Sequence, residues 1–184
     1  QAGAEVVAFL NRQQARLIAE GPHDARFDPP WTSCHAGIFR SGSALNIVPH
    51  EAEIAFEYRH IPAHDAGALL AELRHHAETV LVPPMRAVHP QAAILFDERP
   101  RLPGMDLAEG HPLADLVRAL TGANEAGRVA YGTEGGIFQE AGMAAIVCGP
   151  GDIAQAHTPD EWIAESELVA CERFLARLAD RLAA

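Results

Sequence analysis

Residues 148–162, CGPGDIAQAHTPDEW, place a histidine in a loop rich in glycine and proline. His157 is preceded by Asp152 and followed by Asp160 and Glu161. An imidazole in this setting can bind a metal ion or transfer a proton, or it can be an ordinary surface side chain. Zinc needs three or four protein ligands, and the chain has no HxH, HxD or HExxH spacing. These residues alone leave all three roles open.

A second stretch with chemical potential is YGTEGG, residues 131–136, between an expected strand and an expected helix. Backbone N–H groups at the start of a helix can hold an anion. Thr133 adds a hydroxyl group, and Glu134 adds a negative charge that can hold an amine. The same glycines also suit a turn that only lets the backbone pack closely, so both interpretations stand.

A third stretch is SGSALNIVP, residues 41–49, which precedes an expected strand that ends at Arg59. The planar guanidinium of an arginine at a strand end can bind a carboxylate through two parallel hydrogen bonds. The alternative is a solvated hairpin with a surface arginine. The run RHHAE, which contains His75, His76 and Glu78, is interpreted as a solvated helix face because adjacent helical residues point apart.

Composition excludes several classes of function. All 14 basic residues are arginine, so Schiff-base and P-loop lysine chemistry is ruled out, and no GxSxG motif supports a serine hydrolase. The net charge of −11 without a basic block argues against nucleic acid and anionic membranes as partners. No apolar run approaches the roughly 20 residues that cross a bilayer. Three widely spaced cysteines predict reduced, mostly buried thiols and a cytoplasmic protein.

The first half of the chain supplies the elements that would position the hairpin residues. Apolar spacing predicts a helix over 1–21, and alternation predicts a hairpin over 33–60 with Ala52, Ile54, Phe56 and Tyr58 on one face. A second helix over 64–84 is expected to end at Pro83 and Pro84, and a strand is expected over 92–98. A further strand before residue 1 would complete a βαββαβ ferredoxin-like fold, so we expect a truncated chain.

The second half reads as a separate segment that begins after a boundary near Leu102. It contains expected helices over 111–122 and 165–182. Between them lie a strand, a Gly-rich turn and a short helix over 127–142, followed by an apolar strand over 143–151. Two strands make a weak independent sheet, so this segment resembles the end of a larger one. We therefore expect it to expose apolar surface.

Together, the stretches 41–59 and 129–162 closely resemble the di-zinc aminoacylase and carboxypeptidase family. The Gly-Thr-Glu run, the Cys-Gly-Pro-Gly loop and the His-x-Pro-Asp-Glu-Trp ending carry the resemblance, which covers essentially the whole chain. Within this family YGTE favours the acetylornithine deacetylase branch over succinyl-diaminopimelate desuccinylase. The resemblance implies an α+β chain. A ferredoxin-like two-layer α/β lid, which forms homodimers, would occupy 1–102, and the carboxy-terminal part of an α/β zinc-hydrolase catalytic domain would occupy 103–184.

The resemblance also implies roles for individual residues. His157 corresponds to the last zinc ligand. Asn46 and Arg59 correspond to lid residues that reach the substrate, with Arg59 binding its α-carboxylate. The wall of the substrate pocket corresponds to Gly132, Thr133 and Glu134. From its charge, we infer that Glu134 faces the side-chain amine of ornithine.

The implied reaction is the removal of acetate from N-acetylornithine, a step of arginine biosynthesis. Members of this family use two zinc ions per subunit, an aspartate bridging them and a glutamate as general base. The remaining ligands and the general base precede the lid in the family, so this chain is expected to carry no catalytic residue, to retain no zinc and to be inactive alone. Two alternatives stay open: a non-catalytic dimerisation module, and a related desuccinylase or dipeptidase.

Overall fold

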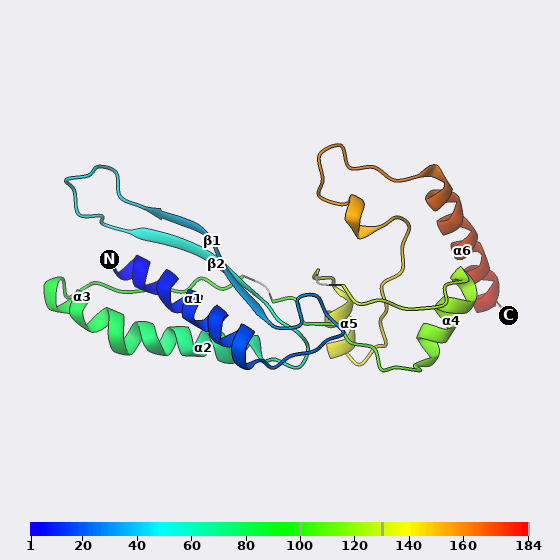
Figure 1. Cartoon of the computed structure of the whole chain (residues 1–184), viewed down its shortest axis with the longest axis horizontal. Coiled ribbons are helices and arrows are strands. Elements are labelled where there is room, and N and C mark those ends of the chain that lie inside the picture. Colours follow the sequence, from blue (N-terminus) through cyan, green and yellow to red (C-terminus); the bar gives the residue numbers. More distant parts are fainter. Residues whose placement is uncertain (100, 130, 184) are drawn as a thin grey trace. The chain divides into compact units, whose positions relative to one another are not determined.

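The computed structural model describes residues 1–99, 101–129 and 131–183. These residues form two compact units. Unit 1 contains residues 1–104 and 128–132, and unit 2 contains residues 105–127 and those from 133 onward. Figure 1 shows the helices and strands of both units along the chain. No helix in the described ranges is long and apolar enough to cross a membrane.

Unit 1 begins with helix α1 (Ala2–Glu20), as the apolar spacing predicts. Its buried face includes Val6, Leu10 and Leu17, which recur near the helical period. The helix ends at Gly21, whose φ of 75° lies in the region that glycine adopts without steric cost. This face packs against the hairpin that follows in the chain.

The predicted hairpin is confirmed. Strands β1 (Ser33–Ser41) and β2 (Ala52–Arg59) pair antiparallel, from Ser33 opposite Arg59 to Ser41 opposite Ala52. A bulge at Gly37 lies between the paired residues Ala36 and Ile38. The inward face also agrees with the alternation, since three side chains of β2 are half-buried against the core: Ile54, Phe56 and Tyr58.

The second helix extends further than its sequence suggests. Helix α2 (Ala66–His76) starts at Asp65, whose side chain accepts a hydrogen bond from the Gly67 amide at 2.8 Å. It passes through a π-helical turn, η1 (Ala77–Leu81), into α3 (Val82–Val88). The predicted end at Pro83 and Pro84 is therefore wrong. The wide turn places both prolines in the first turn of α3, where a missing N–H costs little.

The core of unit 1 lies between the helices and one face of the hairpin (Figure 1). Leu73 is fully buried there together with Val6, Leu10 and Leu81. The expected solvated face of α2 is also partly wrong, because the ring of His76 stacks on Phe9 with 4.5 Å between ring centroids. The residue is half-buried, so this imidazole is part of the packing between α1 and α2.

Three expected strands do not form. The described parts of residues 92–98, 127–132 and 143–151 join no sheet, and the sheet in the described residues consists of β1 and β2. Ile94 and Phe96 still pack against the core as partly buried side chains. A strand also needs a partner for its backbone groups, and apolar periodicity cannot supply one. The ferredoxin-like arrangement therefore stays a prediction.

Unit 2 consists of short elements joined by extended chain. Helix α4 (Pro112–Thr121) ends at Gly122 as predicted, with φ 80°. It is followed by α5 (Gly135–Glu140), the 3₁₀ turn η2 (Ile153–Gln155) and α6 (Glu165–Ala183). Helices α4 and α6 are in contact, and Nη1 of Arg177 donates to the carbonyl of Leu120 at 3.0 Å. None of the described residues of α6 is buried.

Candidate functional site

The Thr133–Glu134 turn is built from short local contacts. Thr133 Oγ1 accepts a hydrogen bond from the Gly135 amide at 3.1 Å. The carbonyl of Glu134 accepts from the amides of Ile137 at 2.9 Å and Phe138 at 3.2 Å, which starts α5. A Cβ atom at Gly135 would collide with the sulfur of Met105, so a larger residue here would have to displace that flexible side chain. The turn thus directs the side chain of Glu134 away from the helix that it begins.

This arrangement differs from the anion cradle considered from the sequence. The Gly135 amide already donates to Thr133, so it has no hydrogen left for a bound anion. Helix α5 has only six residues, and its dipole is correspondingly weak. The chemistry of this turn therefore depends on its side chains, above all on the carboxylate of Glu134.

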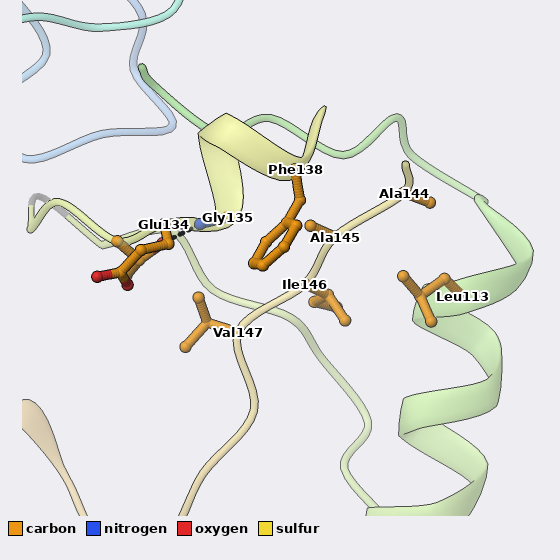
Figure 2. A pocket seen from close by; sticks show the side chains of 9 residues that line it. Leu113, Glu134, Gly135, Phe138, Ala144, Ala145, Ile146 and Val147 are labelled. Carbon is orange, nitrogen blue, oxygen red and sulfur yellow. Dashed lines mark hydrogen bonds between the residues drawn. The ribbon is translucent and has the colours of Figure 1, made fainter. Parts of the chain in front are cut away.

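Thr133 and Glu134 line a shallow, open pocket of about 400 Å³ in unit 2. Figure 2 shows apolar side chains along its floor and the carboxylate of Glu134 at one end. The remaining lining residues are Leu113, Gly135, Phe138, Ala144, Ala145, Ile146 and Val147. Gly132 belongs to unit 1 and does not line this pocket. The pocket offers an apolar surface with a negative charge at its edge.

His157 lies elsewhere in unit 2 and is not a lining residue of the pocket. It is exposed, with a left-handed backbone at φ 58°. Its amide donates to Oε2 of Glu161 at 2.9 Å. Asp152 caps η2 by accepting from the amide of Ala154 at 2.8 Å. These two carboxylates therefore shape the loop.

Asn46 and Arg59 are both in unit 1, at opposite ends of the hairpin. Asn46 is exposed in the loop between the strands, whereas Arg59 is the last residue of β2. An eight-residue strand spans about 25 Å, so one small molecule cannot contact both side chains of the same chain. Nε of Arg59 donates to Oε1 of Glu57 at 2.8 Å on the exposed face.

The sequence analysis missed a polar cluster inside unit 1. Gln13 is 3% exposed and donates to the carbonyl of Leu69 at 3.0 Å, while its own Oε1 accepts from the hydroxyl of Tyr58 at 2.7 Å. Burial raises the pKa of Tyr58 and lifts that of the Cys34 thiol to about 11. A glutamine at a core-facing helical position is the only sequence signal for this cluster. It ties α1 to α2 and β2, and its role is structural.

A family model described as "Peptidase family M20/M25/M40" matches residues 28–181, which is most of the chain. The chain belongs to this family. It is therefore a member of a family of hydrolases, in agreement with the resemblance seen in the sequence.

Several curated proteins that are similar to this chain are deacetylases of N-acetylated amino acids. The acetylornithine deacetylase of Myxococcus xanthus is 32% identical over 92% of this chain and 43% of its own length. The N-acetyl-L-citrulline deacetylase of Xanthomonas campestris pv. campestris is 32% identical over 72% of this chain and 34% of its own length. An acetylornithine deacetylase of Photorhabdus laumondii is 27% identical over 89% and 40%. The chain thus spans less than half the length of these relatives.

Few of the described side chains near His157 could bind a metal ion together with it. Within the described ranges, no three His, Cys, Asp or Glu side chains lie close enough together to hold a metal ion. His157 offers one imidazole, and Asp152 and Glu161 are engaged with the backbone. These residues do not fit a zinc ion by themselves, because a zinc site takes at least three protein ligands.

Proposed function

We propose that this chain supplies the lid and the carboxy-terminal part of the catalytic domain of a zinc-dependent N-acyl-amino-acid deacetylase. Its substrate would be N-acetylornithine and its products ornithine and acetate, in arginine biosynthesis in the cytoplasm. The observation that carries this proposal is the 32% identity to an acetylornithine deacetylase over 92% of the chain. The family match over 28–181 supports the reaction type, which is hydrolysis.

In this proposal the lid comprises residues 1–102 and the catalytic part comprises residues 103–184. The lid would also form the homodimer. Asn46 and Arg59 would contact the substrate from the lid, and Gly132, Thr133 and Glu134 would form part of its pocket. Because Asn46 and Arg59 lie at opposite ends of the hairpin, each would serve a different molecule of substrate.

His157 would be one zinc ligand, with the others contributed by protein outside this chain. The described residues do not build a zinc site by themselves. The chain's own contribution is to bind and orient the substrate. Unable to activate water, it would be inactive alone, because amide hydrolysis needs a positioned base or metal.

Zinc analysis and reconstitution test this proposal. After exhaustive dialysis, the purified chain should contain close to no zinc by elemental analysis. Adding the amino-terminal half of the Myxococcus xanthus relative as a separate polypeptide should restore zinc-dependent release of acetate from N-acetylornithine. The His157→Ala variant should lower both zinc content and activity of the reconstituted pair. A stable ratio of one or two zinc ions in the chain alone would contradict this account of His157.

A second candidate is a non-catalytic dimerisation module, which is consistent with the finding that no three metal-donor side chains lie together among the described residues. It predicts a pair that is soluble and binds zinc but releases no acetate. A third candidate keeps the family and changes the substrate, as in a desuccinylase, a dipeptidase or an N-acetylcitrulline deacetylase, and the Xanthomonas relative favours the last of these. A panel of N-acyl amino acids on the active pair separates these substrates.

A further inference from the structure

The pocket of unit 2 has an uneven distribution of polarity. Its floor is apolar, from Leu113 and Phe138 to the extended residues 144–147. Of the described side chains that line it, Glu134 is the one with a charge, and it stands at one end of the pocket (Figure 2). A ligand that complements this surface has an aliphatic chain and one positive end.

The carboxylate of Glu134 also differs from its acidic neighbours in unit 2. Asp152 caps η2, Glu161 holds the amide of His157, and Glu167 accepts from the amide of Gly151 at 3.2 Å. Within the described ranges, the Glu134 carboxylate has no hydrogen bond or ion pair, although the backbone of Glu134 starts α5. Its charge is therefore not used to hold the fold.

We propose that Glu134 and the apolar floor form a side-chain subsite, selective for N-acyl amino acids whose aliphatic side chain ends in a cation. This inference rests on the proposed function and specifies which substrates the site prefers. The methylene groups of the ligand would cover Phe138 and Val147, and its cationic end would lie against the carboxylate. A neutral end gains no attraction there, and an anionic end is repelled.

The size of the preference follows from exposure. Glu134 is exposed, and ion pairs in contact with water contribute only modestly because water and salt screen them. We expect a cationic ligand to bind about two- to fivefold more tightly than a neutral ligand of the same shape. Salt should weaken this preference and leave the apolar contribution unchanged.

The test uses the complete 184-residue chain labelled with ¹⁵N, with the amides of Gly135 and Gly136 as reporters beside the pocket. Three probes share one acetylated backbone: N-acetyl-L-ornithine, N-acetyl-L-citrulline and N-acetyl-L-norleucine. Norleucine is the closest control, since a methyl group replaces the ammonium of ornithine. We expect the ornithine probe to give the lowest Kd in low salt, and added sodium chloride to bring it toward the other two.

Two variants assign the preference to one residue. Glu134→Gln keeps the shape of the side chain and should remove the advantage of the ornithine probe over the norleucine probe. Glu125→Gln removes the same charge from an exposed loop residue of unit 2 that does not line the pocket, and it should leave the preference intact. Equal binding of all three probes to the unchanged chain would overturn the inference. So would the absence of chemical-shift changes at the amides of both Gly135 and Gly136. A preference for the ornithine probe that survives in Glu134→Gln would overturn it as well.

The hydrolysis assay keeps the two proposals apart. If the reconstituted pair releases acetate from all three probes with equal kcat/KM, the deacetylase proposal holds and the subsite is wrong. If the chain selects the ornithine probe through Glu134 but the pair releases no acetate, the subsite stands as a binding site and the deacetylase proposal fails.

Discussion

Helices α1 and α6 both have 19 residues and an amphipathic sequence, yet they have different environments. Helix α1 buries four residues, Val6, Leu10, Gln13 and Leu17, against the hairpin and α2. None of the described residues of α6 is buried, and Leu168, Leu175 and Leu182 are exposed. The same kind of helix is covered in unit 1 and largely uncovered in unit 2.

The difference indicates that unit 1 has the larger hydrophobic core and is the more stable of the two units. Unit 1 has two layers and a contiguous core, which is the minimum for a stable domain. Unit 2 buries few apolar residues, among them Ala114 and Leu120 on α4, and exposes others such as Phe138 and Trp162. The exposed surface agrees with the sequence-based expectation for this segment. Exposed apolar surface of this kind is typical of regions that pack against something else.

The largest expected effect comes from emptying the core of unit 1. Leu73 is 0% exposed, so Leu73→Ala removes its burial and leaves a cavity. Unit 1 should lose about 3 kcal/mol of unfolding free energy. Urea denaturation followed by the fluorescence of Trp31, in a Trp162→Phe background, measures unit 1 specifically.

The matched change in unit 2 is Leu175→Ala on α6, where the side chain is 55% exposed. Exposed substitutions usually change stability by less than about 0.5 kcal/mol. The fluorescence of Trp162, in a Trp31→Phe background, follows the unfolding of unit 2. If Leu175→Ala destabilises unit 2 as much as Leu73→Ala destabilises unit 1, then α6 is buried in solution. The contrast between the two helices would then be wrong.

A smaller effect is expected from the polar cluster of unit 1. Tyr58→Phe removes the hydroxyl that donates to Gln13 at 2.7 Å, and leaves the Oε1 of a buried glutamine without that partner. We expect a loss of about 1–2 kcal/mol in the same denaturation assay. The double variant Tyr58→Phe with Gln13→Leu should lose less than the sum of the two single losses. Additive losses would show that the two side chains are not coupled.

Replacing the glycine that ends α4 in unit 2 should lower the free energy of unfolding of that helix by about 1 kcal/mol. Gly122 ends α4 with φ 80°, a conformation that an alanine adopts only with strain of about this size. Gly127→Ala is the control, because nothing lies near either glycine and only Gly122 has a positive φ. Amide exchange in α4 should become about fivefold faster in Gly122→Ala. Equal exchange in both variants would mean that α4 is already frayed, which would sharpen the contrast with unit 1.

Local patterns predict much of the fold and less of the site. The spacing of apolar residues gives α1, the hairpin and the end of α4 at Gly122, because each depends on neighbours close in sequence. It fails at 92–98 and 143–151, where a strand depends on a distant partner, and at Pro83, where a π-helical turn changes the outcome. Thr133 and Glu134 do line one pocket. The structural roles of Glu161 and Gln13 depend on three-dimensional contacts that no spacing rule contains.

The smallest expected effect is the pH dependence of unit 1 that arises from His64. Its Nδ1 lies 3.0 Å from Oγ1 of the fully buried Thr32, which also accepts from the amide of Ile61. Since that hydroxyl has one hydrogen to give, we infer that the neutral imidazole accepts it. Burial lowers the pKa of His64 below 6.5, and nearby His60 and Arg16 act in the same direction, while Asp65 and Glu72 oppose them.

The unfolded chain therefore takes up a proton near pH 6.5, whereas the folded chain does so only at lower pH. The contribution of neutral His64 to stability is complete above pH 6.5 and is lost as the pH falls through its lowered folded pKa. His64→Gln should flatten the urea midpoint between pH 7 and 5, and His75→Gln, on the exposed part of α2, should not. A decline that persists in His64→Gln would have to come from other groups. Burial raises the pKa of Glu72, but the hydrogen bonds from Arg16 and Gln13 outweigh burial and hold that pKa below 4.5. Protonation of Glu72 therefore changes the stability of unit 1 only at a pH of about 4.5 and below.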